Sequence, residues 1–157
     1  MNIPVVPITA DNTASAVDAL RELWPHYAPE EMVRVIDQQL RPNGYQLAGI
    51  FADDSPTAAA VLGYRIQHSL WLGQSLYIVD IATLPKWRGR GFGDRLMEWA
   101  EAEAARLGCS AMHLDSGVGR ERAAAHRLYM RHHYQIGCHH FVKKLGGSSR
   151  AQEDTAL

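Results

Sequence analysis

The sequence has few cysteines and no long apolar run. Its 157 residues contain two cysteines, Cys109 and Cys138, which form no CxxC pair. A reduced setting is the simpler interpretation, and a single disulfide between the two is the alternative. No apolar stretch approaches the ~20 residues that a membrane-spanning helix needs, and no basic segment followed by an apolar one opens the chain. We therefore expect a soluble, cytoplasmic protein without a membrane partner.

An excess of one charge is also missing. Sixteen Lys and Arg residues against 17 Asp and Glu residues give a formal net charge of −1. A general nucleic-acid binder carries a basic excess, so we expect no nucleic-acid partner. Apolar residues make up 46% of the chain, which is enough for a sizeable core. The length predicts a single domain over residues 1–146, followed by a disordered tail over residues 147–157.

The order of apolar patterns along the chain predicts an α/β (α+β) fold. Two prolines confine the first predicted strand to a sheet edge, and the nearly continuous apolar run of the fourth is typical of a central strand. Strands are expected at residues 3–8, 45–52, 58–70, 75–84, 111–116 and 134–145. Helices are expected from Val17, from Pro29 and over residues 120–132. A further long helix is expected where apolar residues recur at helical spacing from Leu96 to Leu107, and Gly108 ends it.

The segment PKWRGRGFGDRL, residues 85–96, contains three glycines and three arginines between an apolar strand and a long helix. At such a place free backbone N–H groups and the positive end of the helix dipole point into a crevice. Glycines allow positive φ, so successive N–H groups can form a concave site for a phosphate or pyrophosphate. A Walker A loop needs Gly-Lys-Ser/Thr, and a G-x-G-x-x-G loop needs a third glycine near Asp94 or Leu96; both are missing. The alternative is a soluble turn with incidental arginines.

Two motifs resemble those of the GNAT superfamily of acyl-CoA-dependent N-acetyltransferases. Arg88, Gly91 and Gly93 match its R-x-x-G-x-G pyrophosphate loop. AHRLYMRHHY, residues 125–134, is similar to its A-x-x-x-Y-x-x-x-G-F helix. The resemblance is close over residues 45–145, whereas before residue 45 it rests on the order of elements.

The chain departs from the family pattern at two positions. Arg122 stands where the family often has asparagine, and His133 replaces the usual glycine after the helix. Histidine is among the residues that tolerate positive φ, so the helix can still end there.

The resemblance implies a fold and a reaction. The fold is a central mixed, mostly antiparallel sheet of six or seven strands flanked by four helices, forming one N-acetyltransferase domain over residues 1–146. The reaction moves an acetyl group from acetyl-CoA, the co-substrate, to a primary amine by direct attack in a ternary complex. The acceptor is a small-molecule or peptide amine, and the protein is expected to be a homodimer.

The resemblance also implies which residues bind acetyl-CoA. The backbone of residues 81–83 would pair with the pantetheine arm, and the amides of residues 89–94 would hold the pyrophosphate. Arg122 and Tyr129 are seven residues apart, which places them on one helix face about 10.5 Å apart along the axis. The expected cofactor-binding residues are Ile81, Ala82, Thr83, Arg88, Gly89, Arg90, Gly91, Phe92, Gly93, Asp94, Arg122 and Ala125.

Two residues are predicted to be catalytic. Tyr129 would lie beside the sulfur and protonate the leaving thiolate. Asp80, the one acidic residue in its apolar strand, would hold the ammonium group or accept its proton. The alternative is that Asp80 caps a bulge or pairs with an arginine. Asp115 and Glu98 are weaker candidates for the same role.

Aromatic residues and histidines offer further candidates. Trp24 and Tyr27, together with Asp80, are predicted to bind the acceptor, and Trp71 is a further candidate for its pocket; ordinary packing is the alternative for the three aromatic residues. The histidines of residues 126–140 lack H-E-x-x-H or Cys/His spacing, so no metal site is expected. A second class of function is a non-catalytic acyl-CoA-binding or sensing module on the same fold, which would not need an acid such as Tyr129.

Overall fold

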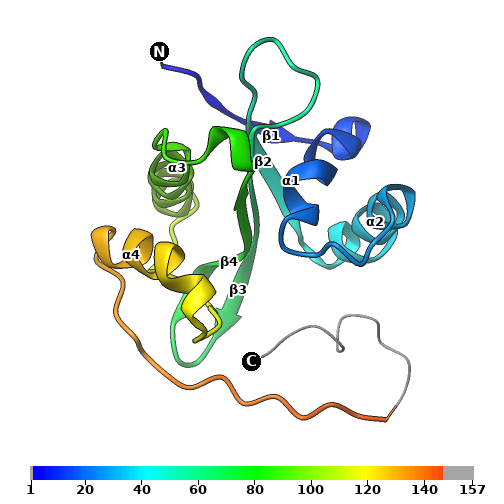
Figure 1. The fold of residues 1–157 in the computed structure, drawn as a ribbon. Helices are drawn as coiled ribbons and strands as arrows, with labels where there is room; N and C mark the ends of the chain where they lie inside the picture. The colour runs from blue at the N-terminus through cyan, green and yellow to red at the C-terminus, as the bar shows by residue number, and fades with distance from the viewer. Residues whose placement is uncertain (1, 147–157) are drawn as a thin grey trace. The chain divides into compact units, whose positions relative to one another are not determined.

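A computed structural model describes residues 2–146 in two compact parts, residues 2–114 and residues 115–146. Each part is described by itself, and the tail predicted over residues 147–157 lies outside the described residues. The first part contains one five-stranded sheet in the order β1-β2-β3-β4-β5. Figure 1 labels the strands from β1 to β4. The strands are β1 (Val5–Ile8), β2 (Gln46–Ile50), β3 (Ala60–Ser69), β4 (Gly73–Thr83) and β5 (Ala111–Leu114).

The pairing of the strands confirms a mixed, mostly antiparallel sheet. The strands from β1 to β4 pair antiparallel in sequence order, and β5 pairs parallel to β4. As its prolines predict, β1 lies at one edge, whereas β4 lies inside the sheet. Both cysteines of the chain lie among the described residues and are free thiols.

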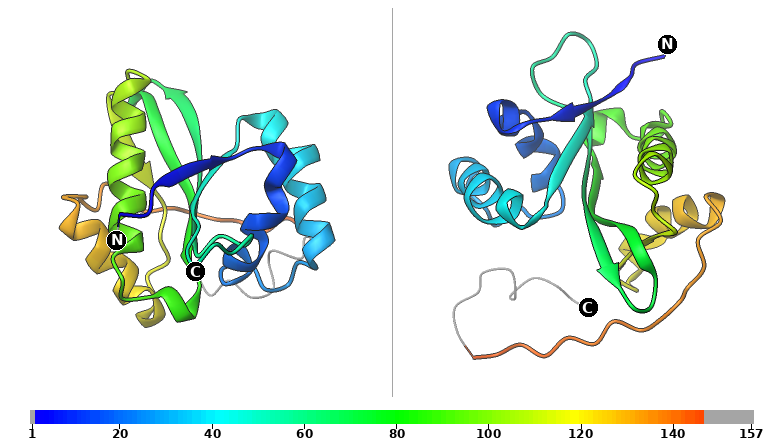
Figure 2. Two further views of the ribbon diagram at one scale, coloured as in Figure 1. Left: turned by 90° about the horizontal axis from the view of Figure 1, so that it is seen from above. Right: turned by 180° about the vertical axis from the view of Figure 1, so that it is seen from behind.

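Helices cover both faces of this sheet. On one face lie α1 (Val17–Arg21) and α2 (Pro29–Val35), and on the other lies α3 (Phe92–Arg106) (Figure 2). The chain continues α2 through a π-helical turn (Ile36–Leu40) and a 3-10 turn (Arg41–Asn43), and Gly44 ends this segment with a φ of 91°. The α1–α2 face of the sheet is packed by a cluster of buried apolar residues that includes Val17, Leu20, Met32, Ile36, Leu47 and Val61.

A β-bulge interrupts the pairing of β3 with β4. Gly63 pairs with Asp80 but the next residue, Tyr64, pairs with Ile78, so Val79 is left unpaired. A bulge of this kind changes the phase of side chains along a strand, because one extra residue is inserted. Consequently the side chains of Asp80 and Tyr77, three positions apart, lie on the same face of the sheet.

The parallel pairing leaves part of β4 open. It extends from Ser75 to Ile78 of β4 and ends there, because β5 ends at Leu114. In the described sheet, residues 79–83 of β4 therefore pair with β3 only. We call the opposite side of residues 79–83 the free edge of β4. Of the described helices, none has the length and apolar character to cross a membrane.

The second part contains the helix of the second motif. It begins with a 3-10 turn (Arg120–Arg122) and continues as α4 (Ala123–Arg131). His133 has a φ of 62°, so it takes the left-handed conformation after the helix, as its tolerance for positive φ predicts.

The strand predicted at residues 134–145 is wrong, because this segment has no regular secondary structure. Its apolar side chains are exposed; Ile136 and Phe141 are 85% and 92% exposed. A strand needs a neighbour to accept its backbone hydrogen bonds, and alternating side chains alone do not supply one. The described sheet therefore has five strands rather than the six or seven expected, while four helices are present as predicted.

Candidate active site

The glycine-rich loop has the backbone geometry of an anion site. Gly89 and Gly91 have φ values of 73° and 79°, and Gly91 is the residue directly before α3. A Cβ atom added at either glycine would meet no protein atom within 4 Å. The left-handed conformations turn backbone N–H groups toward one side at the positive end of a 15-residue helix. The loop therefore offers space and N–H donors to an anionic ligand.

Aromatic side chains hold this loop in place. Trp87 and Phe92, both buried, stack with ring centroids 5.9 Å apart and so connect the start of the loop to α3. The Arg90 guanidinium lies 4.8 Å from the Trp87 ring centroid, and the Lys86 ammonium lies 5.4 Å from it. These cation–π contacts keep two positive charges beside the glycines.

Arg88 is bound to protein groups. Its Nε donates to the Thr83 carbonyl oxygen at 3.1 Å, and its Nη2 donates to Glu22 Oε2 at 3.0 Å. Arg88 thus ties the loop to the end of β4 and to the turn after α1. This contact is structural, and the cofactor contact predicted for Arg88 stays a prediction.

The free edge of β4 carries backbone groups next to this loop. The Leu84 N–H donates to the Ala59 carbonyl, toward β3. Backbone groups alternate between the two sides of a strand, so Ala82 also points to β3, whereas Ile81 and Thr83 point to the free edge. Of the three residues expected to pair with pantetheine, Ile81 therefore presents its N–H and C=O groups as a strand partner would require. Thr83 presents its N–H group, while its C=O group already accepts from Arg88 Nε.

Asp80 is a buried carboxylate with two side-chain donors. It is 7% exposed. Trp24 Nε1 donates to Asp80 Oδ1 at 2.7 Å, and the Tyr45 hydroxyl donates to Oδ2 at 2.7 Å. The structure thus brings together two of the predicted acceptor-site residues, Trp24 and Asp80. The side-chain partners of Asp80 are thus a tryptophan and a tyrosine, and not the arginine that was the alternative.

The environment of this carboxylate favours proton uptake. Burial raises the pKa of Asp80 above its usual range, and the hydrogen bonds from Tyr45 and Trp24 partly oppose this increase. Burial, followed by the negative charge of Asp80, raises the pKa of the Tyr45 phenol well above its usual value, so Tyr45 remains a donor. Each carboxylate oxygen accepts one bond and keeps a further lone pair. The site can therefore accept one more N–H or O–H group.

Tyr45 and Gly63 are parts of this site that the sequence did not indicate. Gly63, opposite Asp80 on β3, leaves the space that the Tyr45 hydroxyl occupies. Tyr45 is 35 residues from Asp80 in the sequence, and no local pattern connects the two. Tyr27, the third residue predicted to bind the acceptor, has its ring against that of His26, with a centroid distance of 4.5 Å. Its contact with the acceptor stays a prediction.

Tyr129 lies on α4, in the second part, and is 6% exposed. Burial raises the pKa of its phenol, while the charge of Arg122 and hydrogen bonding to Arg122 and Ser116 lower it. The two residues predicted to share a helix face therefore interact, although Arg122 lies in the 3-10 turn before α4. His126 Nε2 lies 3.1 Å from Ser116 Oγ, so Ser116 connects both side chains to the segment before the turn. The protonated phenol is available as a donor.

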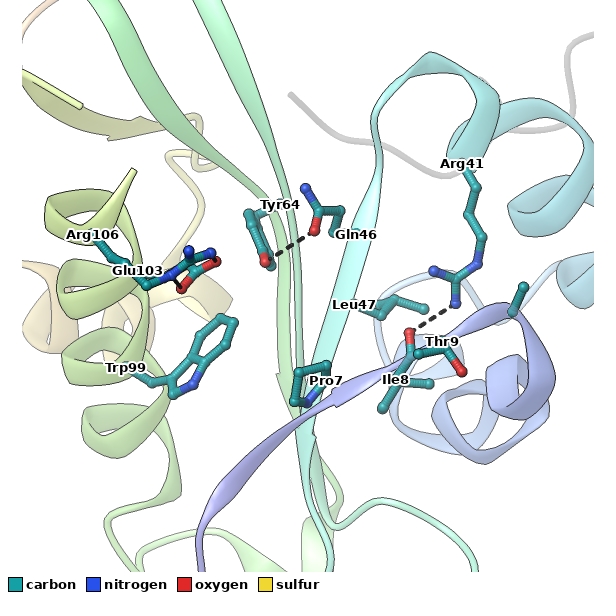
Figure 3. A pocket seen from close by; sticks show the side chains of 11 residues that line it. Pro7, Ile8, Thr9, Arg41, Gln46, Leu47, Tyr64, Trp99, Glu103 and Arg106 are labelled. Atoms are coloured by element: carbon teal, nitrogen blue, oxygen red, sulfur yellow. Dashed lines mark hydrogen bonds and ion pairs between the residues drawn. The ribbon is translucent and has the colours of Figure 1, made fainter. Parts of the chain in front are cut away.

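A groove of about 630 Å³ lies between β1, β2 and α3 in the first part, away from every predicted site residue (Figure 3). Its two arginines already have carboxylate partners, since Arg41 binds Asp37 at 3.0 Å and Arg106 binds Glu103 at 2.6 Å. Burial, followed by the charge of Glu103, raises the pKa of Tyr64 to about 12. The groove therefore has no unneutralised charge that would favour an ionic ligand. Elsewhere among residues 2–146, no three His, Cys, Asp or Glu side chains are placed to hold a metal ion.

The mixed sheet with helices on both faces, and a glycine-rich loop directly before α3, define an α/β fold with a candidate anion site. A model of the acetyltransferase (GNAT) family matches residues 13–134, and the chain therefore belongs to this family. The resemblance found in the sequence is confirmed.

Solved structures agree with the fold. An aminoglycoside N-acetyltransferase in complex with CoA has a TM-score of 0.77 and 14% identity, over 93% of this chain and 96% of that chain. Glucosamine-6-phosphate N-acetyltransferase from Arabidopsis thaliana has a TM-score of 0.70 and 17% identity, over 92% and 99% of the two chains.

Two curated relatives match part of the chain. An aminoalkylphosphonate N-acetyltransferase from Salmonella typhimurium is 33% identical over 82 residues, which are 52% of this chain and 50% of that protein. A thialysine N-epsilon-acetyltransferase from Bos taurus is 26% identical over 107 residues, 60% of this chain and 63% of that protein. The chain therefore spans half of the first relative's length and 63% of the second's.

A first prediction tests the anion site of the loop. Gly91→Val forces a branched residue into positive φ, and its side chain enters the open space beside the N–H groups. We expect acetyl-CoA affinity, measured by calorimetric titration, to fall about 100-fold. The reason is the loss of two charge-assisted hydrogen bonds from loop N–H groups to the pyrophosphate, each of about 1.5 kcal/mol, or about a factor of ten. Gly108→Val is the control, since Gly108 has a φ of 74° and open space at the other end of α3. Equal affinities in the two variants would contradict the assignment.

A second prediction concerns the support of Asp80. In Gly63→Ala the new methyl group overlaps the Tyr45 hydroxyl, which must leave Asp80 Oδ2. We expect the free energy of unfolding, measured by urea denaturation, to fall by about 1–3 kcal/mol. Gly117→Ala, whose Cβ would meet Arg122 Cγ at an ordinary 3.6 Å, is the control and is expected to change stability little. A Gly63→Ala protein as stable as wild type would show that Tyr45 does not need its present position.

Proposed function

We propose that the protein transfers an acetyl group from acetyl-CoA to a small-molecule primary amine. The observation that carries this proposal is the free edge of β4, which ends at the glycine-rich loop and has Asp80 at its start. A thioester arm paired with Ile81 and Thr83 would leave its pyrophosphate at the loop and its acetyl end near Asp80. Membership of the acetyltransferase family supports the same reaction.

The proposed step forms a C–N bond and breaks the C–S bond of the thioester. The amine arrives mostly as ammonium, since its pKa is near ~10.4 on the lysine scale. Asp80 holds the ammonium group and accepts its proton, directly or through water. The neutral amine then attacks the acetyl carbon, which a backbone N–H of the free edge polarises. The thiolate leaves and takes the proton of the Tyr129 phenol, while the attacking nitrogen loses its remaining extra proton to water. Exchange with solvent then restores the phenol proton and removes the proton held by Asp80.

The relatives support a small amine as acceptor. Their names specify an aminoalkylphosphonate and thialysine, and a structural neighbour is named for aminoglycosides. Trp24 and Tyr27 are proposed to line the acceptor site, since Trp24 already contacts the carboxylate that would receive the amine. A homodimer and a cytoplasmic location remain predictions from the sequence.

The decisive experiment is a thiol-release assay with acetyl-CoA and a panel of small amines, together with calorimetric titration of acetyl-CoA. Turnover with any amine supports the enzyme. Binding of acetyl-CoA without release for any acceptor would favour the acyl-CoA-binding module.

A third prediction tests Asp80. In Asp80→Asn the amide cannot accept a proton, so we expect kcat/KM for the amine to fall about 100-fold or more, the usual scale for a general base. Acetyl-CoA affinity is expected to stay within about twofold, because binding of the cofactor does not use this carboxylate. The control is Asp18→Asn, which changes an exposed carboxylate on α1. Equal losses in kcat/KM for the amine and in acetyl-CoA affinity would show that Asp80 has a structural role instead.

A fourth prediction tests Tyr129. Tyr129→Phe removes the phenol proton, and we expect kcat to fall about 100-fold with unchanged acetyl-CoA affinity, because the interaction strengthens only as sulfur becomes charged. Tyr134→Phe is the matched control, since its ring lies 6.2 Å from the Tyr129 ring. Steady-state kinetics with a good acceptor decide the matter. A Tyr129→Phe enzyme at wild-type speed would remove the catalytic role.

A further inference from the structure

The sheet face that carries Asp80 continues toward the β3–β4 turn as a row of polar and aromatic side chains. Arg65 of β3 pairs with Tyr77 of β4, and Tyr77 pairs with His113 of β5. Because of the bulge at Val79, these three residues face the same side as Gly63 and Asp80. At this end, β3 and β4 run past α1 and α2 (Figure 1).

The members of this row hold one another in place. The Arg65 guanidinium lies 5.5 Å from the Tyr77 ring centroid, and the His113 ring lies 4.9 Å from the Tyr77 ring. The Gln67 side chain lies between Arg65 and His113. With its amide oxygen turned toward Arg65, it accepts from Arg65 Nε and Nη2 at 3.0 Å, and its amide nitrogen donates to His113 Nε2 at 3.3 Å. At the turn, Trp71 is 65% exposed with its ring 6.3 Å from that of His113.

Arg65, like Arg90 of the glycine-rich loop, has no carboxylate partner among the described residues, whereas three other arginines of this part have one. Arg41, Arg88 and Arg106 each bind a carboxylate. None of the ion pairs described between residues 2 and 146 includes Arg65, whose described acceptor is the neutral Gln67 oxygen. A partly buried guanidinium is stabilised by an anion, and its fork of donors suits a carboxylate or phosphonate.

The separation of this cation from Asp80 is short. Arg65 lies two residues from Gly63, the partner of Asp80, which corresponds to about 7 Å along the strand. The same sheet face therefore presents the Asp80 carboxylate and, about two residues further along, the Arg65 guanidinium, which has no carboxylate partner among the described residues. This arrangement is complementary to a small molecule with an ammonium group at one end and an anion at the other.

We propose that Arg65, flanked by His113 and Trp71, binds the anionic end of a zwitterionic acceptor whose amine lies at Asp80. The acceptor class is a short ω-amino acid or aminoalkyl phosphonate rather than an uncharged or polycationic amine. This proposal rests on the proposed function, because it takes Asp80 as the place of the reacting amine.

The test compares acceptors that differ only in the anionic end. Thiol release from acetyl-CoA is measured with 3-aminopropanoate to 6-aminohexanoate and 2-aminoethylphosphonate, and with alkylamines of matched length. We expect kcat/KM of the wild type to favour the acidic acceptors about 10- to 100-fold. Arg65→Gln is expected to remove this preference by raising KM for the acidic acceptors only, with unchanged acetyl-CoA affinity. Arg34→Gln, at an exposed arginine of α2, is the control and keeps the preference.

Calorimetric titration of 6-aminohexanoate and hexylamine in the presence of CoA separates the two proposals. Preferential binding of 6-aminohexanoate that depends on Arg65 supports the anion subsite even where no acceptor is turned over, and in that case only the proposed acetyl transfer fails. Equal binding of the two compounds, or an Arg65→Gln variant that weakens neutral and acidic acceptors alike, would overturn the anion subsite while leaving acetyl transfer intact.

Discussion

A carboxylate inside a protein is stable only when polar groups replace the water it has lost, and Asp80 imposes this requirement on the structure around it. Trp24 and Tyr45 supply the two hydrogen bonds, from segments 56 and 35 residues away in sequence. Their positions in turn depend on the packing of α1 against the sheet and on the absence of a side chain at Gly63. The buried charge, the glycine and the two aromatic donors therefore form one unit, and none of them can change alone without leaving a polar group unpaired.

The second constraint is the unequal length of the two neighbours of β4. The long β3 pairs with β4 along its whole length, whereas the short β5 pairs with four of its residues. Backbone groups at the free edge need partners, and a ligand with amide groups can provide them as a strand would. The chain leaves this edge at the glycine-rich loop, where N–H donors and nearby arginines suit the charged end of the same ligand.

Much of this arrangement follows from local sequence patterns. The backbone of the loop was predictable because glycines between a buried strand and a helix allow positive φ, which Gly89 and Gly91 adopt. The strands up to β5 follow from their apolar runs. The segment over residues 134–145 has the same alternation as a strand but remains irregular, since pairing depends on a neighbour that the pattern does not specify. Asp80 stood out as a lone acid in an apolar strand. Tyr45, Gly63 and Arg65 did not, because their importance comes from the register of β3 against β4, and no local spacing encodes a register.

The extra residue at Val79 divides β4 into two segments whose side chains alternate out of phase with one another. Toward the loop, the strand offers the fixed Asp80 carboxylate and the backbone groups of the free edge, and the backbone groups change little when other side chains are replaced. Toward the turn, it offers side chains, which substitution alters freely. A lineage of such proteins can therefore diversify the turn-proximal segment while the loop-proximal segment keeps its geometry, and acquire new chemical preferences without rebuilding the rest of the sheet.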